Sequence, residues 1–192
     1  MKVTQLNKGT LGENNSVFIA FYAKPTYHYQ TSEECRNWGK DCWNANIALL
    51  GFGMRWDASC GFVGGKVDEG QTLVEAALRE SVEEVGTALT EDKLTLICTH
   101  EMHNEETGYK QNTHVFLCEL TSDEIYSIRN VNLANAEHGK VEVAGFNVVH
   151  MVEDAFDNLP NLVWAGTAQQ EIELILSSGV LPRPEIKCNG TW

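Results

Sequence analysis

The stretch GGKVDEGQTLVEAALRESVEEVG, residues 64–86, constrains the fold of this chain more than any other feature. Thr72 and Glu75 have the spacing of a capping box, which marks the start of a helix. Apolar residues then recur at helical spacing, at Val74, Leu78, Val82 and Val85. Gly86 is a natural stop, because glycine readily adopts the left-handed conformation that ends many helices. The pattern predicts a helix from about residue 73 to 85 whose apolar stripe is buried.

Three glutamates, Glu80, Glu83 and Glu84, crowd one side of this helix. At about 100° per residue they fall within one arc, roughly opposite the apolar stripe. Like charges at these spacings cost a helix about 0.2–0.5 kcal/mol per pair, which a solvated face tolerates. A divalent cation would reverse that cost, because carboxylate oxygens are the ligands that Mg²⁺ and Mn²⁺ prefer. The three acids are therefore either a solvated helix face or a metal site.

The net charge of the chain limits what such a site can bind. The sequence has 27 acidic residues against 14 Lys and Arg, and its formal net charge is −13. Such a charge repels a phosphate backbone, which disfavours a large RNA partner bound along a groove. Mg²⁺ usually takes its remaining ligands from substrate phosphates, so a divalent cation would let an acidic protein hold a nucleotide locally. The composition favours a small nucleotide over a long nucleic acid.

The apolar periodicity changes repeatedly between strand and helix, which predicts one mixed α/β domain over residues 1–192. Strands are expected at residues 17–23, 46–54, 94–100, 113–120 and 145–151. Besides the helix at 73–85, helices are expected from the capping pair Thr121 and Glu124 to about Asn132, and over 167–176. A long polar and aromatic loop occupies residues 24–43, and the tail from about residue 181 is expected to be loosely attached.

The sequence also indicates where the protein acts. The N-terminal residues contain no apolar signal region, and no run of eighteen apolar residues occurs, so we expect a cytoplasmic protein with no membrane partner. Six cysteines are scattered without a C-x-x-C pair. We expect them to be free thiols rather than a zinc site or a disulfide framework.

Residues 64–87 follow the pattern G-x5-E-x7-R-E-U-x-E-E-x-G-U, where U is a bulky apolar residue. Six of its specified residues are in register: Gly65, Arg79, Glu80, Glu83, Glu84 and Gly86. So many matches at fixed spacing are improbable at ordinary residue frequencies. The segment resembles the Nudix box, and the chain is identified as a member of the Nudix hydrolases. This resemblance favours the metal site over the solvated face.

The chain departs from the box at Gln71, Ser81 and Thr87. Gln71 replaces a glutamate that, by the resemblance, supports Arg79 rather than binding metal. An amide oxygen can still accept a hydrogen bond from a guanidinium, so we expect Gln71 to modulate Arg79 without abolishing metal binding. Ser81 lies on the predicted buried stripe, where its hydroxyl can bond to a carbonyl in the preceding turn.

Outside the box, short segments resemble one Nudix branch, the inosine-diphosphatase and small-nucleolar-RNA-decapping enzymes, over about residues 17–180. These segments are GMRWDASCGFVGG, HVFLCELT, HGKVEVAGF and LVWAGTAQQEIELIL. The resemblance implies a Nudix-fold α/β/α sandwich with a mixed central sheet, a homodimer, and Mg²⁺ or Mn²⁺ as cofactor. It implies hydrolysis of a nucleoside diphosphate linked to a further group.

The resemblance also implies roles for the acidic residues. Glu80 and Glu84 match the main metal ligands, with Glu83 beside them and the backbone carbonyl of Gly64 as a further ligand. Glu83 and Glu84 thereby also belong to the catalytic group. Arg79 is expected to orient the box acids without touching the metal. Glu142 matches a glutamate that is a candidate general base, although an exposed strand residue is an equal interpretation.

Substrate contacts are implied at a second group of residues. Arg55 matches a phosphate contact and Phe62 a contact on or near the base, while Thr167 and Glu171 match substrate-side positions in the last helix. Phe18 stands where the branch has a base-contacting histidine. Glu171 stands in place of a neutral glutamine, so it could serve as an extra metal ligand or read a base edge. The preferred base therefore stays open.

Arg55 and three tryptophans each allow a structural role as well as a substrate contact. Arg55 could simply pair with Asp57, as surface arginines often do. The tryptophans Trp43, Trp56 and Trp164 could stack on a base or could pack in the core or at its rim.

The predicted function is a metal-dependent hydrolase that cleaves the phosphoanhydride of a nucleoside diphosphate-linked substrate such as IDP. Alternative substrates are 5′-capped RNA, which the net charge disfavours, and ADP-ribose or NADH. A non-catalytic nucleotide-binding module with the same fold is the alternative of another class. The presence of Glu80, Glu83 and Glu84 together favours catalysis.

Overall fold

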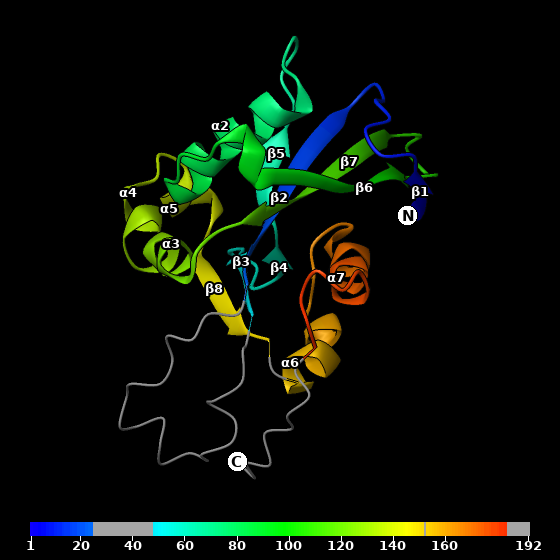
Figure 1. Cartoon of the computed structure of the whole chain (residues 1–192). Coiled ribbons are helices and arrows are strands. Elements are labelled where there is room, and N and C mark those ends of the chain that lie inside the picture. Colours follow the sequence, from blue (N-terminus) through cyan, green and yellow to red (C-terminus); the bar gives the residue numbers. More distant parts are fainter. Residues whose placement is uncertain (25–47, 152, 184–192) are drawn as a thin grey trace, which may run out of the picture.

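The protein is built around a mixed sheet with helices on both faces (Figure 1). The structure is a computed structural model that describes residues 1–24, 48–151 and 153–183. Strand order is β1-β6-β7-β2-β3-β4, with β5 paired to β2 and β8 paired to β3. The strands are β1 (Lys2–Leu6), β2 (Asn15–Ala23), β3 (Leu49–Met54), β4 (Cys60–Gly61), β5 (Val63–Lys66), β6 (Leu94–His103), β7 (Lys110–Glu119) and β8 (Gly145–His150).

The five predicted strands are present where the structure describes them. Most of the predicted loop at 24–43, the first two residues of the strand predicted at 46–54, and Trp43 lie outside the described residues. β6 and β7 pair antiparallel, and both extend further toward their connecting turn than the periodicity indicates. β1, β4 and β5 were not predicted, because β1 is a largely exposed edge strand and the other two are short and rich in glycine.

The helical segments include both predicted capping boxes. They are α2 (Leu73–Val85), η2 (Glu91–Lys93), α3 (Ser122–Ser127), η3 (Ile128–Asn132), α4 (Leu133–Asn135), α5 (Gly139–Glu142), α6 (Glu153–Asn158), η4 (Leu159–Asn161) and α7 (Ala168–Ser177). Thr72 accepts a bond from the backbone N–H of Glu75, and Thr121 accepts one from Glu124. Glu142 ends the short helix α5, so its interpretation as an exposed strand residue is wrong.

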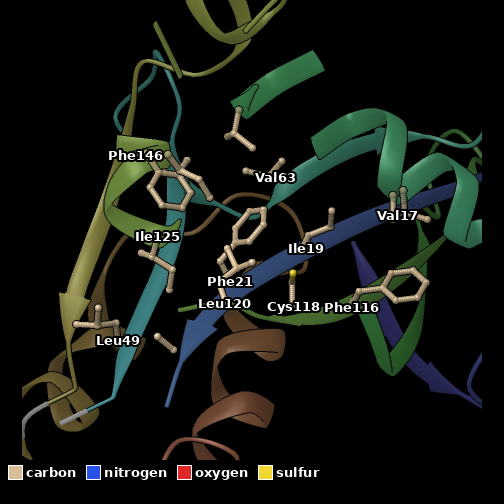
Figure 2. Close-up of a cluster of buried hydrophobic side chains, with 14 of the residues drawn as sticks. Val17, Ile19, Phe21, Leu49, Val63, Phe116, Cys118, Leu120, Ile125 and Phe146 are labelled. Atoms are coloured by element: carbon tan, nitrogen blue, oxygen red, sulfur yellow. The ribbon is translucent and has the colours of Figure 1, made fainter. Parts of the chain in front are cut away.

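β2 lies at the centre of the sheet and is buried on both faces. It pairs in parallel with β7, while its first half pairs antiparallel with β5 and its last residues with β3. Val17, Ile19 and Phe21 point into one core layer, shared with α2, α3 and β8 (Figure 2). Ala20 belongs to the second layer, shared with α6 and α7. This alternation is what a strand covered on both sides requires.

The second core layer extends to the end of the described chain. Ile172 and Ile175 of α7 pack there with Phe156 of α6. Leu181, where the sequence predicts a loose tail to begin, is buried in the same layer, and Arg183 forms an ion pair with Asp157. The chain is therefore packed up to residue 183, and the remaining tail lies outside the described residues.

Helix α2 turns a different face toward the sheet from the one the apolar stripe predicts. Val82 is 48% exposed, whereas Ala76, Ala77 and Ser81 are buried with Val85. Small side chains let the helix approach β5 and β2 closely, and hydrophobic periodicity gives them little weight. The prediction for Ser81 is confirmed, because its hydroxyl donates to the carbonyl oxygen of Leu78 in the preceding turn at 2.8 Å. The carbonyl oxygen of Thr87 lies at the same distance from this hydroxyl.

The described part of the chain contains no helix long and apolar enough to cross a membrane. Cys60, Cys98 and Cys118 are buried free thiols, as predicted. Burial raises the pKa of both Cys98 and Cys118 to about 12, which makes these thiols poor metal ligands and nucleophiles. The other three cysteines lie outside the described residues.

Two valines of α2 provide a test of its orientation. We expect Val85→Ala to lower the free energy of unfolding by about 2 kcal/mol, because Val85 is fully buried in the core. The matched variant Val82→Ala should change it by less than about 0.5 kcal/mol, because this side chain is half exposed. Urea denaturation of both variants measures the difference. Equal losses would contradict the orientation of the helix.

Candidate active site

Glu80 and Glu84 are brought against the sheet by two glycines of β5. The backbone N–H of Gly64 donates to Glu84 Oε2 at 2.8 Å. Gly64 has a φ of +151°, and a Cβ there would lie 2.0 Å from the carbonyl oxygen of Val17. A Cβ on Gly65 would lie 2.5 Å from Glu80 Oε1. Only glycine at both positions lets these carboxylates, 5% and 7% exposed as residues, lie beside the strand.

Arg79 binds the other side of the acidic cluster. Its Nη1 lies 2.6 Å from Glu83 Oε2 and 2.9 Å from Glu80 Oε1. Its Nη2 donates to the carbonyl of Lys66 at 2.8 Å, and its Nε lies 3.5 Å from Asp68. The expected position of Arg79 beside the box acids is thus observed, and its guanidinium neutralises part of their charge.

Gln71 does not contact Arg79 in the way the sequence suggests. Its side-chain oxygen accepts the backbone N–H of Asp68 at 3.3 Å, and no hydrogen bond joins it to Arg79 within the described ranges. Asp68 in turn faces the guanidinium. Gln71 therefore orders the loop that presents Asp68, and a neutral amide is sufficient for this contact.

Burial changes the proton affinity of two box glutamates. It raises the pKa of Glu84 from about 4.5 to about 8, against the opposing effect of the Gly64 N–H. The charge of Glu80 and a hydrogen bond shared with Glu142 raise this pKa further. Burial also raises the pKa of Glu80, although the adjacent Arg79 opposes that shift. The charged form of the Glu84 carboxyl is therefore disfavoured, and Glu84 ionises at a higher pH than an exposed glutamate.

The donor set matches a hard divalent cation in part. No group of three His, Cys, Asp or Glu side chains forms a ready metal cage among residues 1–24, 48–151 and 153–183. Glu80 and Glu84 are buried carboxylates in electrostatic contact, and the solvent-exposed Glu142 hydrogen-bonds to Glu84. An incomplete set of oxygen ligands suits Mg²⁺, which keeps waters and takes ligands from substrate phosphates. The residues therefore fit Mg²⁺ or Mn²⁺ and do not suit zinc.

All five predicted substrate-contacting residues line one cavity of about 110 Å³. They are Phe18 from β2, Arg55 and Phe62 from the segments around β4, and Thr167 and Glu171 from the start of α7. Contacts between distant segments bring these residues together. Cys60 forms a parallel bridge with Trp164, which places the loop before α7 beside β4. The predicted extra metal role of Glu171 is not supported by its place here, since Glu84 lines separate grooves.

The sequence analysis did not identify the other residues of this cavity, and Met102 and Gln111 have the largest side chains among them. Met102 and Gln111 lie opposite one another on β6 and β7 and complete its wall. The alternation of these strands predicts that both residues point to one face. Nothing local to either strand indicates that this face lies over a cavity.

Arg55 lies between the cavity and an acidic groove. It lines the cavity with Phe62, and it also lines the groove with Glu84 and Glu142. The alternative pairing with Asp57 is not formed, because Asp57 accepts the N–H and hydroxyl of Ser59 and no ion pair of Arg55 occurs within the described part of the chain. The guanidinium is exposed, so it can bind an anion shared by both spaces.

The tryptophans have different environments. Trp164 packs against Phe52 and Phe62, with ring centroids 5.0 and 5.6 Å apart, and its Nε1–H donates to the Leu159 carbonyl. Packing is therefore its role in this structure. Trp56 is 67% exposed and lines the acidic groove beside the exposed Val141.

Solved structures provide a comparison for the fold. A mutT/nudix family protein from Listeria innocua is 12% identical, with a TM-score of 0.54 over 88% of this chain and 95% of its own. The NUDIX domain of Shewanella oneidensis NrtR, solved with ADP ribose, is 13% identical, with a TM-score of 0.54 over 88% and 90%. The E. coli dihydroneopterin triphosphate pyrophosphohydrolase is 18% identical, with a TM-score of 0.50 over 85% and 95%. These similarities confirm a Nudix fold.

Family membership comes from the sequence. A search of curated proteins found no match. The family model described as "Nudt16-like: U8 snoRNA-decapping enzyme-like" matches residues 13–176, which include the box, the cavity and the groove. The chain therefore belongs to the Nudt16-like family of the Nudix hydrolases and is an enzyme of the pyrophosphohydrolase class.

Proposed function

We propose that the protein hydrolyses the phosphoanhydride of a nucleoside diphosphate-linked substrate with the help of Mg²⁺ or Mn²⁺. The observation that favours this most is the position of Arg55 between an aromatic-walled cavity and the groove of Glu84 and Glu142. A base in the cavity would place its diphosphate at the guanidinium, with the scissile bond over the acids. Phe18 and Phe62 would contact the base.

Each acidic residue has a separate task in this proposal. Glu80 and Glu84 would hold the metal, with Glu83 and the Gly64 carbonyl beside them. A bound divalent cation neutralises phosphate charge and lowers the pKa of a bound water by several units. Glu142 would accept the proton of the attacking water, since it is exposed to the groove and contacts Glu84. Arg79 would keep Glu80 and Glu83 in position.

ADP-ribose, NADH and capped RNA are alternative substrates in this proposal. ADP-ribose and NADH contain the same diphosphate, and the NrtR domain was solved with ADP ribose. Capped RNA is disfavoured by the net charge of −13. A homodimer, which the family resemblance implies, and a cytoplasmic location, which the sequence led us to expect, stay predictions.

The exposed Trp56 favours a substrate with a second group beyond the diphosphate. Its ring lines the acidic groove together with Arg55 and Val141, and it does not line the cavity. Its turn is well ordered by bonds from Arg55 N–H to the Ser59 carbonyl and from Ala58 N–H to the Arg55 carbonyl. A planar group could stack there, as bases stack on exposed aromatic rings.

A substrate panel tests the hydrolase proposal. The protein with Mg²⁺ or Mn²⁺ should cleave at least one of IDP, GDP, ADP-ribose, NADH and capped RNA, with products resolved by chromatography. Glu84→Gln should lower kcat by about 100-fold or more, because it removes the charge of a proposed metal ligand. Glu91→Gln, which alters an exposed acid that lines neither the groove nor the cavity, is the matched control. Cleavage of no substrate would favour the non-catalytic binding module, and turnover of Glu84→Gln within about threefold of the parent would refute the assignment.

The pKa of Glu84 provides a second test, read as stability. The folded protein binds more protons than the unfolded chain between the ordinary value of about 4.5 and the folded value of about 8. The free energy of unfolding of the metal-free protein should therefore fall as the pH rises through this range. Mg²⁺ or Mn²⁺ binds the ionised form, so it should raise the melting temperature more at pH 8 than at pH 5.

Calorimetry with and without metal measures this difference. Glu84→Gln should flatten the pH dependence and remove most of the metal response, whereas Glu91→Gln should change neither. An equal metal response at both pH values would contradict a site built on Glu84.

Trp56→Ala tests the second group. We expect the KM for NADH to rise about tenfold while the KM for IDP changes little, because only NADH has a planar group to stack beyond the diphosphate. Trp56→Phe should retain most of the affinity. An equal rise in the KM for NADH and the KM for IDP would contradict stacking of Trp56 on the second group.

A further inference from the structure

Glu171 is a buried carboxylate at the wall of the cavity. It is 1% exposed and belongs to the first turns of α7, where the helix dipole favours negative charge. No Lys or Arg forms an ion pair with it in the part of the chain that the structure describes. A carboxylate buried this deeply is costly unless hydrogen-bond donors surround it.

The protein holds one of its two oxygens. Thr167 Oγ1 donates to Glu171 Oε1 at 2.5 Å. His100 Nδ1 lies 3.8 Å from the same oxygen, which is too long for a hydrogen bond. No hydrogen bond to Oε2 is formed by the described residues, and the residue lines the cavity. Oε2 and a remaining lone pair of Oε1 are thus available to donors of a ligand.

The walls around this carboxylate favour a ligand with flat faces that can pack against apolar side chains. Phe18 and Phe62 provide aromatic surface, and Met102 and Ala168 add apolar contacts. Arg55 lies at the side toward the acidic groove, so a cationic ligand would meet a like charge there. A neutral aromatic ring with a pair of N–H donors on one edge satisfies both conditions.

We propose that Glu171 makes the cavity selective for guanine, whose N1–H and 2-amino group can donate together to one carboxylate. Hypoxanthine has the N1–H but no 2-amino group. Adenine presents an acceptor at N1, which a carboxylate repels. Paired donors to a carboxylate give strong and geometrically specific bonds, so this edge distinguishes the three purines. The inference rests on the proposed function in one respect, the placement of the base in this cavity.

Binding of nucleoside monophosphates tests the inference apart from hydrolysis. GMP, IMP and AMP contain no phosphoanhydride, so isothermal titration calorimetry in EDTA measures base selectivity even if the protein cleaves nothing. The parent should bind GMP about tenfold or more tightly than IMP and AMP, because both donors of guanine meet an acceptor. Glu171→Gln should bring GMP and IMP within about threefold, because an amide supplies one acceptor and places a donor beside the second.

Glu173→Gln, on the exposed face of the same helix, is the matched control and should keep the preference of the parent. Equal binding of GMP and IMP by the parent would overturn the inference. So would a guanine preference that survives in Glu171→Gln, or no binding of any of the three purines. Guanine selectivity in a protein that hydrolyses no member of the substrate panel would refute the proposed function alone.

Discussion

The close approach of β5 to β2 at Gly64 is the contact on which the rest of the structure depends. Any side chain at this position would collide with the Val17 carbonyl, because its Cβ would lie only 2.0 Å away. The approach completes the sheet beside β2, which is covered by a core layer on each face. It also directs the Gly64 N–H to Glu84. One backbone contact thus joins the packing of the domain to the geometry of the acidic site, and both are lost if β5 moves away.

Local signals in the sequence predict the elements well and their burial less well. The caps at Thr72 and Thr121 place the starts of two helices to the residue, because a capping box is a contact within four residues. The buried face of α2 could not be predicted from its valines, since Ala76, Ala77 and Ser81 determine the packing and are hydrophobically weak. The box predicts that the acids share one arc, but only the sheet determines that Glu80 and Glu84 turn inward.

The cavity marks the limit of prediction from the sequence. Phe18, Phe62 and Glu171 come from segments far apart in the chain, and a resemblance to a family was needed to group them. Met102 and Gln111 escape this route, because each reads as an ordinary strand residue until β6 and β7 are paired. Long-range pairing, such as the bridge from Cys60 to Trp164, decides which residues meet.

The negative charge of the acidic cluster is compensated only in part. Arg79 neutralises Glu80 and Glu83, so these acids are tolerated beside a buried helix face. Burial raises the pKa of Glu84 to about 8, since one backbone N–H opposes the shift only in part and no Lys or Arg of the described residues pairs with this carboxylate. A fully compensated cluster would be more stable but would attract no further positive charge. The unpaired carboxylate is therefore the part of the cluster that can respond to a divalent ion, and Arg79 limits the cost of holding it there.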